Sequence, residues 1–494
     1  MNGTKGEFKS PLKKLFYFEK GSVSMIMRLV FPILIELILG TSFGMIDHMM
    51  AGQHSTHALN AIGLYGTPSS IFNIAFTAIN VGTTVRVAWN IGAKKFETAR
   101  RVMVTSIKLN FLISFVTTAI CMFAAPAAIS FLAGDTYGSV NVPGTVAYDA
   151  VDVFRICSAG LVFQAVQSSI TASLRGAGEN RAPLYYNITS NFLNVIGNYI
   201  FIYGVDFLGI PEMAAQGAAL STSLCNGIRC VLAVLFICLS KKSRLGFKNE
   251  VFNTDFNEDE SENENKKKKR SLLPDITISK KILDVGIPSA IESLIIQFGF
   301  LLLAKMIVST GQESYAAHQV TNSINSLFLI VGSAFSSAAN TIVGQHSGAK
   351  DIGGVKYYVG AITRISLFVS LILALVMWLF AGNLITLYTH DATVIDISTQ
   401  LLYICAFVEI FANLLAVFSG ALRGTGDTKY PVYVAIFCVL ILRVSLVFIA
   451  VNILHLGILG VWGVTLIDNM VRCVFMIIRY KSGRWVKRIN SEEI

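Results

Sequence analysis

Charged residues are scarce in this sequence. Asp, Glu, Lys and Arg make up 14% of its 494 residues, against about a quarter in an ordinary soluble domain. The apolar residues also lack the alternating pattern of membrane β-barrel strands. Instead, they form blocks of about 20 residues, the length that crosses a lipid hydrocarbon core as a helix. These features exclude a water-soluble globular domain and predict an all-α polytopic membrane protein.

The motifs of several enzyme classes are missing. The eight cysteines form no Cys-x-x-Cys pair, and the histidines form no His-Glu-x-x-His cluster, so we expect no metal centre and no other cofactor. Neither glycine-rich Arg-Gly-x-Gly loop ends in Gly-Lys-Ser/Thr, which argues against an ATP site. Uphill transport by this chain would therefore depend on an ion gradient, and a membrane-embedded enzyme is only a distant alternative.

Twelve transmembrane helices are predicted from the apolar blocks. Their approximate ranges are 24–48, 62–88, 103–124, 150–172, 183–204, 215–239, 281–308, 317–342, 357–380, 397–420, 431–451 and 458–479.

The distribution of Lys and Arg predicts the orientation. The connections at 49–61, 125–149, 205–214, 309–316, 381–396 and 452–457 contain neither residue, whereas the alternate connections contain several. Because positive residues accumulate on the cytoplasmic side, both termini are predicted to be cytoplasmic. The net charge of +10 is then mainly a topological signal, and we expect no nucleic-acid partner.

A polar segment divides the predicted helices into two sets of six. Residues 241–280 include an acidic stretch followed by a basic run, and we predict a disordered cytoplasmic linker there. The domains are then an N-terminal lobe at 1–240 and a C-terminal lobe at 281–494.

Three motifs recur in both halves in the same order, which indicates an internal duplication. Since each half contains an even number of spans, the repeats are parallel, an organisation typical of transporters. We expect the arginine of each Leu-Arg-Gly-x-Gly loop to lie near the lipid headgroups. The motif pairs are Pro32-x-x-x-Glu36 and Pro288-x-x-x-Glu292, Gly92-Ala93-Lys94 and Gly348-Ala349-Lys350, and Leu174-Arg175-Gly176-x-Gly178 and Leu422-Arg423-Gly424-x-Gly426.

Carboxylates within a span are costly and are candidate site residues. In the first span, Glu36 and Asp47 are 11 residues apart, so they share one helix face. Glu36 is a cavity candidate. Asp47 is an ion-site candidate, although a solvated helix end is the alternative for this residue.

Two spans carry stripes of amide side chains. Asn187, Asn191, Asn194 and Asn198 follow one face of the fifth span, and Asn73 and Asn80 follow one face of the second. Interhelical hydrogen bonding is one explanation. A hydrated chamber that binds H⁺ or Na⁺ through carboxylate and amide oxygens is the other.

The C-terminal half has fewer buried polar groups. Glu292, Glu409 and Arg443 are its cavity candidates. A buried arginine needs a partner, and we expect Glu292 or Glu409 to pair with Arg443. A structural ion pair and a substrate site both remain open for these three residues.

Taken together, the motifs resemble the multidrug and toxin extrusion (MATE) transporters. The resemblance covers both halves and adds the segments 46–52, 194–204 and 316–319 to the repeated motifs. It implies two six-helix lobes around a central cavity, and export of amphipathic organic cations in exchange for H⁺ or Na⁺ by alternating access. The implied protein is a monomer that lies in the lipid of the cell membrane.

The resemblance also assigns roles to individual residues. Asp47 matches the first-span carboxylate on which coupling depends, and Asn194 and Asn198 match the fifth-span pair that works with it; a bound Na⁺ would lie there. Many members have Asp at the second of these positions. Some members carry another acid where this chain has Ala412, which leaves Glu409 as a possible substitute.

A lipid-linked sugar flippase of the same superfamily is the main alternative. Its cavity would need more cationic groups for a diphosphate, and within the spans we identify only Arg443, with Arg86 and Lys305 as further candidates.

Overall fold

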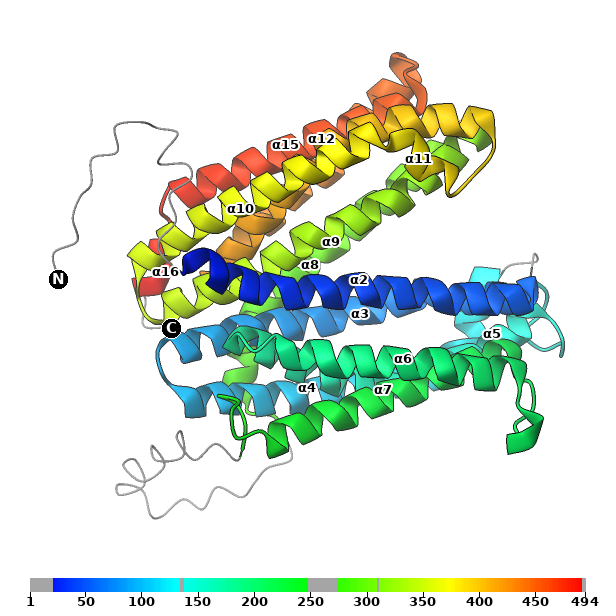
Figure 1. Cartoon of the computed structure of the whole chain (residues 1–494), viewed down its shortest axis with the longest axis horizontal. Helices are drawn as coiled ribbons and strands as arrows, with labels where there is room; N and C mark the ends of the chain where they lie inside the picture. The colour runs from blue at the N-terminus through cyan, green and yellow to red at the C-terminus, as the bar shows by residue number, and fades with distance from the viewer. Residues whose placement is uncertain (1–20, 134–136, 248–272, 309–310, 491–494) are drawn as a thin grey trace.

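The computed structural model describes residues 21–133, 137–247, 273–308 and 311–490. Its regular structure in these ranges is helical (Figure 1). The N-terminal half contains α2 (Ser22–His54), α3 (Thr56–Gly92), α4 (Phe96–Ala133), α5 (Val146–Ala177), α6 (Arg181–Tyr203), η1 (Asp206–Leu208) and α7 (Ala214–Leu239). The C-terminal half contains α8 (Ile276–Val308), α9 (Gln312–Gly348), α10 (Ile352–Leu379), α11 (Ala381–Thr386), α12 (Ala392–Gly424), α13 (Lys429–Ala435), η5 (Ile436–Arg443), α14 (Val444–Phe448), η6 (Ile449–Ile453), α15 (Gly457–Lys481) and α16 (Val486–Asn490).

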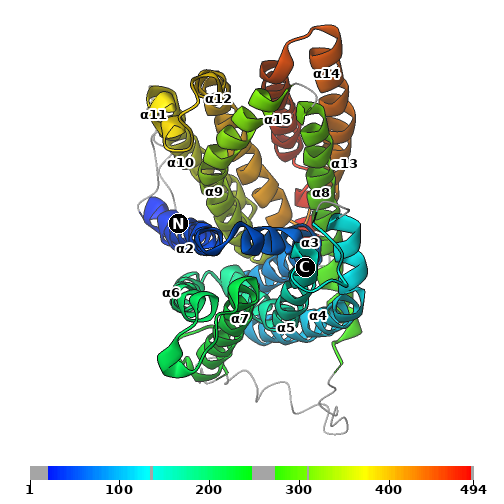
Figure 2. The same ribbon diagram turned by 90° about the vertical axis from the view of Figure 1, so that its right-hand side faces the viewer.

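The helices form two bundles that diverge at one end. We call α2 to α7 the first bundle and α8 to α15 the second bundle. The bundles meet near the start of α2 and α16 and separate toward α11 (Figure 1). Figure 2 shows the same two groups, with α2 along the boundary between them.

The first helix of each half packs against the other half. Ile26 and Val30 of α2 share a hydrophobic core with Phe335 of α9. In the equivalent place, Gly286 of α8 lies so close to α3 that an added Cβ would be 2.0 Å from the carbonyl oxygen of Ala78. These contacts tie the two bundles together.

The backbone also repeats between the halves. Lys94 and Lys350 both have left-handed conformations, with φ of 61° and 55°. Gly178 and Gly426, which end the two Arg-Gly-x-Gly loops, have φ of 82° and 81°. Matching conformations at these unusual positions support the duplication that the motifs indicate.

Nine helical segments in the described ranges are long and apolar enough to cross a membrane, and α3, which bends by 41° beside Ile71, makes a tenth. Helices α5 and α6 fall outside this set because polar residues interrupt their apolar runs. The all-helical membrane fold is therefore confirmed, and the number of twelve spans stays a prediction.

The structure corrects the predicted boundaries around the linker. Helix α8 begins at Ile276 rather than at 281. Leu245 is fully buried within the first bundle, and the Gly246 carbonyl accepts a hydrogen bond from Arg100 (2.8 Å). Most of the predicted linker, 248–272, lies outside the described residues.

Close backbone contacts hold the bundles together at the end near the termini. A Cβ added to Gly92 would be 1.8 Å from the Gln345 carbonyl oxygen, and a Cβ added to Gly348 would be 1.9 Å from the Trp89 carbonyl oxygen. Trp89 also donates a hydrogen bond from Nε1 to the Gly424 carbonyl (2.7 Å). The repeated Gly-Ala-Lys motifs thus form the closed side of the molecule.

Candidate functional site: an ion site and a cavity between the bundles

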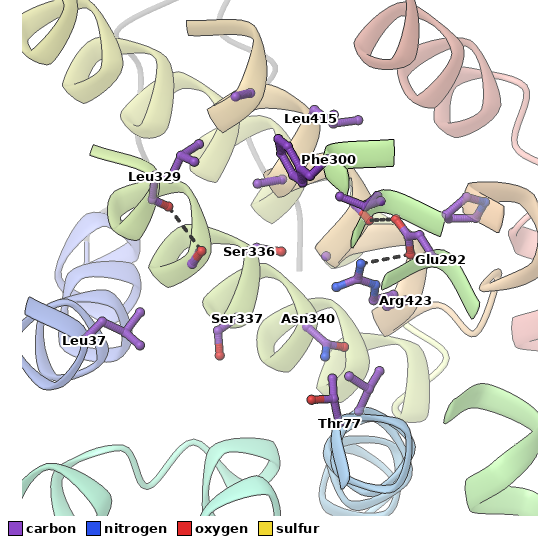
Figure 3. Close-up of a pocket in the computed structure, with 18 of the residues that line it drawn as sticks. Leu37, Thr77, Glu292, Phe300, Leu329, Ser336, Ser337, Asn340, Leu415 and Arg423 are labelled. Atoms are coloured by element: carbon purple, nitrogen blue, oxygen red, sulfur yellow. Dashed lines mark hydrogen bonds and ion pairs between the residues drawn. The ribbon is translucent and has the colours of Figure 1, made fainter. Parts of the chain in front are cut away.

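A cavity of about 980 Å³ lies between the bundles and is lined by residues from both. Leu37 and Thr77 of the first bundle and Phe300 and Asn340 of the second surround the same space (Figure 3). Of the sequence candidates, Glu36, Asn80, Asn187, Asn191, Glu292 and Arg443 line this cavity.

Asp47 and the amide stripe of α6 meet in the first bundle. Asn198 Nδ2 donates to Asp47 Oδ1 (2.6 Å). Because amide orientation is assigned from hydrogen-bond partners, Asn194 is placed with its nitrogen toward the carboxylate. It then donates to both Asp47 oxygens (2.9 and 3.0 Å) and accepts from Ser221 Oγ (3.1 Å). The three predicted ion-site residues therefore form one cluster.

Asp47 is not at a helix end. Helix α2 continues to His54, almost two turns beyond Asp47, and the side chain is half-buried. Asn194 and Asn198 are buried, and Asn198 Oδ1 has no hydrogen-bond partner among the described residues. The cluster thus combines a carboxylate with a free amide oxygen, the ligand types that suit H⁺ or Na⁺.

Two equivalent ion pairs lie on the cavity wall. Arg175 Nη2 donates to Glu36 Oε1 (2.8 Å), and Arg423 Nη2 donates to Glu292 Oε2 (2.9 Å; Figure 3). Asn187 Nδ2 adds a hydrogen bond to Glu36 Oε1 (2.6 Å). Each guanidinium is turned toward a carboxylate on the cavity wall, and the expectation that both arginines lie near the lipid headgroups stays a prediction.

The predicted pairing of Arg443 with Glu292 or Glu409 is wrong. Arg443 pairs with Asp468 of α15, a residue that we did not select from the sequence, and Arg472 donates to the same carboxylate oxygen of Asp468 (2.9 Å). Arg443 and Asp468 are 2% and 0% exposed, so the pair is inside the second bundle and borders the cavity only through the arginines.

Asn73 and Glu409 do not line the cavity, contrary to expectation. Asn73 Oδ1 accepts from Gln164 Nε2 (3.0 Å), which links α3 to α5. Glu409 is fully buried and accepts from Asn413 Nδ2 (2.9 Å). On α12, Val408 and Ala412 face the cavity instead, because Glu409 is rotated toward the side of the helix where Asn413 bonds Ser370 of α10 (2.9 Å).

Sequence reasoning missed two cavity arginines. Arg229 of α7 donates to Asn191 Oδ1 (2.6 Å), and both Arg229 and Arg472 line the cavity. A signal for them is present in the sequence, because Asn-x-(Ile/Val)-Arg-Cys occurs at 226–230 and again at 469–473. The two arginines are therefore equivalent positions of the duplicated halves.

Comparison with known proteins gives a consistent result. The MatE family model matches residues 32–200 and 288–449. A probable multidrug resistance protein NorM of Thermotoga maritima is 27% identical over 94% of this chain and 93% of its own length. The transporter YisQ of Bacillus subtilis is 25% identical over 93% of this chain and 94% of its own.

Solved structures share the fold. A MOP superfamily transporter from Pyrococcus furiosus, described as having a binding pocket of reverse polarity, has a TM-score of 0.80 at 20% identity and covers 98% of this chain and 100% of its own. An outward-facing multidrug resistance MATE transporter has a TM-score of 0.79 at 20% identity, and the match covers 97% of this chain and 100% of that transporter.

A cavity with polar and apolar walls between two bundles of apolar helices, together with these relatives, defines a multi-pass transporter of the cell membrane rather than an enzyme. The chain belongs to the MatE family of multidrug efflux transporters.

Proposed function

We propose that this protein is a secondary active antiporter, which exports small amphipathic molecules in exchange for H⁺ or Na⁺ by alternating access. The observation that carries the proposal is the cluster of Asp47, Asn194 and Asn198. It places a carboxylate and a free amide oxygen inside the first bundle, on the helix that also brings Glu36 to the cavity. Binding of a cation there would change the bonds that join α2 to α6.

Alternating access would include a state that is open to the outside. The positive-inside rule predicts cytoplasmic termini, which would make the closed side with Gly92 and Gly348 cytoplasmic and the cavity open to the outside. This is the state named for the outward-facing MATE relative. Neutralisation of Asp47 by an incoming ion would favour the return to the inward-open state. We also propose that the protein works as a monomer.

Organic cations are the cargo implied by the family, and aromatic side chains such as Phe300 and Trp462 in the cavity suit them. The structure offers them few free charges, however. Both cavity carboxylates, Glu36 and Glu292, are already paired with arginine. A cation would therefore compete with a guanidinium at either position.

A lipid-linked sugar flippase is the second candidate. The observation that favours it is the number of arginines on the cavity wall, which is larger than the sequence analysis recognised. The Pyrococcus furiosus transporter of the same fold is described as having a binding pocket of reverse polarity, which suggests a different function for that protein.

Dye efflux from proteoliposomes tests the antiporter proposal. Wild-type protein should move a rhodamine dye when a Na⁺ or H⁺ gradient is imposed, and the gradient that drives transport identifies the coupling ion. Asp47→Asn should abolish gradient-driven efflux while dye binding in detergent is retained. Asn198→Asp should shift the pH dependence of efflux, because it adds a second titrating group. Normal efflux by Asp47→Asn at equal protein amounts would contradict the proposal.

A further inference from the structure

The charged residues on the cavity wall are predominantly positive. Among the described residues that line it, five are arginines and two are glutamates. Each half contributes one Glu–Arg pair and a second arginine, Arg229 or Arg472. The second bundle adds Arg443, whose partner Asp468 lies behind the wall. The full set is Arg175, Arg229, Arg423, Arg443 and Arg472 with Glu36 and Glu292.

Arg443 and Arg472 share a single carboxylate. Both guanidinium groups donate to Asp468 Oδ2, so this cluster keeps one uncompensated positive charge. Arg443 is 2% exposed, yet its Nε and Nη1 have no hydrogen-bond partner among the described residues, and neither does Arg472 Nε. Buried donors of this kind are costly unless a ligand or water satisfies them.

The surroundings add an apolar face to this charge. The Arg443 guanidinium lies 5.6 Å from the centre of the Phe300 ring. Trp462 of α15 is also buried, and its Nε1 has no hydrogen-bond acceptor among the described residues. Arg443 ends the π-helical segment η5. Such segments change which face of a helix a side chain occupies and are frequent at functional sites.

We propose that Arg443 and Arg472, held by Asp468, form an anion subsite that binds the carboxylate or phosphate group of an amphipathic cargo. Arginine suits this role because its planar fork donates two parallel hydrogen bonds to such groups. The aromatic body of the cargo then lies against Phe300. The proposal rests on the proposed function only in taking the cavity as the cargo site, and it gives the cargo an anionic group that a simple organic cation lacks.

A matched pair of dyes tests this subsite without any gradient. A rhodamine methyl ester is a cation, and its free acid differs only by the carboxylate. Binding of each to purified full-length protein in detergent, measured by fluorescence anisotropy, should favour the free acid by about tenfold, the size of a charge-assisted hydrogen bond. Equal affinities, or tighter binding of the ester, would overturn the proposal.

Three substitutions distinguish an effect of the positive charge on binding from an effect on folding. Arg472→Gln leaves Arg443 paired with Asp468 and removes the uncompensated charge, so the preference for the free acid should disappear. Arg472→Lys keeps the charge but loses the planar fork, and should keep only part of the preference. Lys481→Gln removes an exposed charge at the end of the same helix, away from the cavity, and should leave the preference unchanged. A preference that survives Arg472→Gln in monodisperse protein would contradict the assignment.

Competition identifies the source of the anion. Farnesyl diphosphate carries the diphosphate of a lipid carrier, and dodecanoate carries a single carboxylate. Stronger displacement of the free-acid dye by the diphosphate would support the anion subsite but replace drug export with a flippase. Stronger displacement by the carboxylate would support both proposals. Failure of Asp47→Asn to affect efflux would contradict the antiporter alone, since the binding assay involves no gradient.

Discussion

At the offset of 256 residues that relates Glu36 to Glu292, the counterpart of Asp47 in the second bundle is Leu303. At the offset of 248 that relates the two Arg-Gly-x-Gly loops, Asn194 and Asn198 become Leu442 and Leu446. Leu303 is 5% exposed and belongs to an apolar core. The first bundle therefore holds the proposed ion cluster at positions where the second bundle has leucines.

Other features are the same in both bundles. The Glu–Arg pairs have nearly equal lengths, 2.8 and 2.9 Å, and Gly92 and Gly348 make mirrored contacts on the closed side. The duplicated halves thus share the parts that line the cavity and join the bundles. The difference teaches that the proposed coupling site belongs to one bundle, whereas the contacts that join the bundles come from both.

The largest expected effect comes from the mirrored glycines. Gly92→Ala or Gly348→Ala would place a Cβ within 2 Å of a backbone carbonyl of the other bundle, so α3 and α9 must separate. Both variants should lose most export and shift toward the state that is open near the termini. Spin labels at exposed Lys95 and Lys356 would report the separation as a longer distance.

Gly63→Ala is the control for these two variants. It lies on α3, and an added Cβ there meets nothing within 4 Å. It should leave export and the label distance unchanged. An effect of Gly92→Ala without an effect of Gly348→Ala would break the proposed equivalence of the two contacts.

The next effect concerns the equivalent ion pairs. Glu36→Gln and Glu292→Gln each leave an arginine that is about a quarter exposed without its carboxylate. Each should lower the free energy of unfolding by about 1–3 kcal/mol, less than for a fully buried pair because the cavity is accessible to water. Thermal unfolding in detergent would measure both.

Removing the partner as well provides the control. Glu36→Gln with Arg175→Gln, and Glu292→Gln with Arg423→Gln, should each recover part of the loss, since no unpaired charge remains. A large loss at one pair and none at the other would show that the pairs are not equivalent.

The smallest effect concerns a helix cap that only one half has. Asp351 Oδ1 accepts a hydrogen bond from the Gly354 amide (2.8 Å) at the start of α10, whereas the equivalent residue before α4 is Lys95. Asp351→Ala should cost about 1 kcal/mol. Lys95→Ala should change the unfolding temperature little, and an equal loss at both positions would contradict the role of the cap.

The contribution of this cap depends on pH. The hydrogen bond from Gly354, aided by His346, lowers the pKa of the Asp351 carboxyl. A carboxyl with a lowered pKa in the folded state stabilises the protein above its unfolded pKa and loses that contribution as pH falls through the folded value. The unfolding temperatures of wild type and Asp351→Ala should therefore converge in acid.

Much of this organisation follows from the sequence. Composition predicts the helical membrane fold, and the repeated motifs predict the duplication. The ion cluster also follows, because Asp47 and the α6 asparagines lie on polar faces of apolar helices that need polar partners. Helix ends are less predictable. The apolar pattern stops before polar residues that remain helical, so α2 extends to His54 beyond the predicted end at 48.

Partners between distant helices were not predictable in the same way. Arg443 has several buried acids available by sequence, and only the packing of η5 against α15 selects Asp468. Glu409 illustrates the same limit, because a small rotation of α12 decides whether it or Ala412 meets the cavity. The pairing of Arg175 with Glu36 and of Arg423 with Glu292 depends on how α2 packs near α5 and α8 near α12, which hydropathy does not encode.

The central claim is that the coupling ion binds in the first bundle alone, and ion binding to two variants tests it most directly. Na⁺ binding and proton uptake would be measured on purified wild type and on Asp47→Asn and Glu409→Gln, each of which neutralises one acid within a bundle. Glu409→Gln should bind the coupling ion as wild type does, and Asp47→Asn should not bind it. Retained binding in Asp47→Asn together with lost binding in Glu409→Gln would place the site in the second bundle and contradict the account.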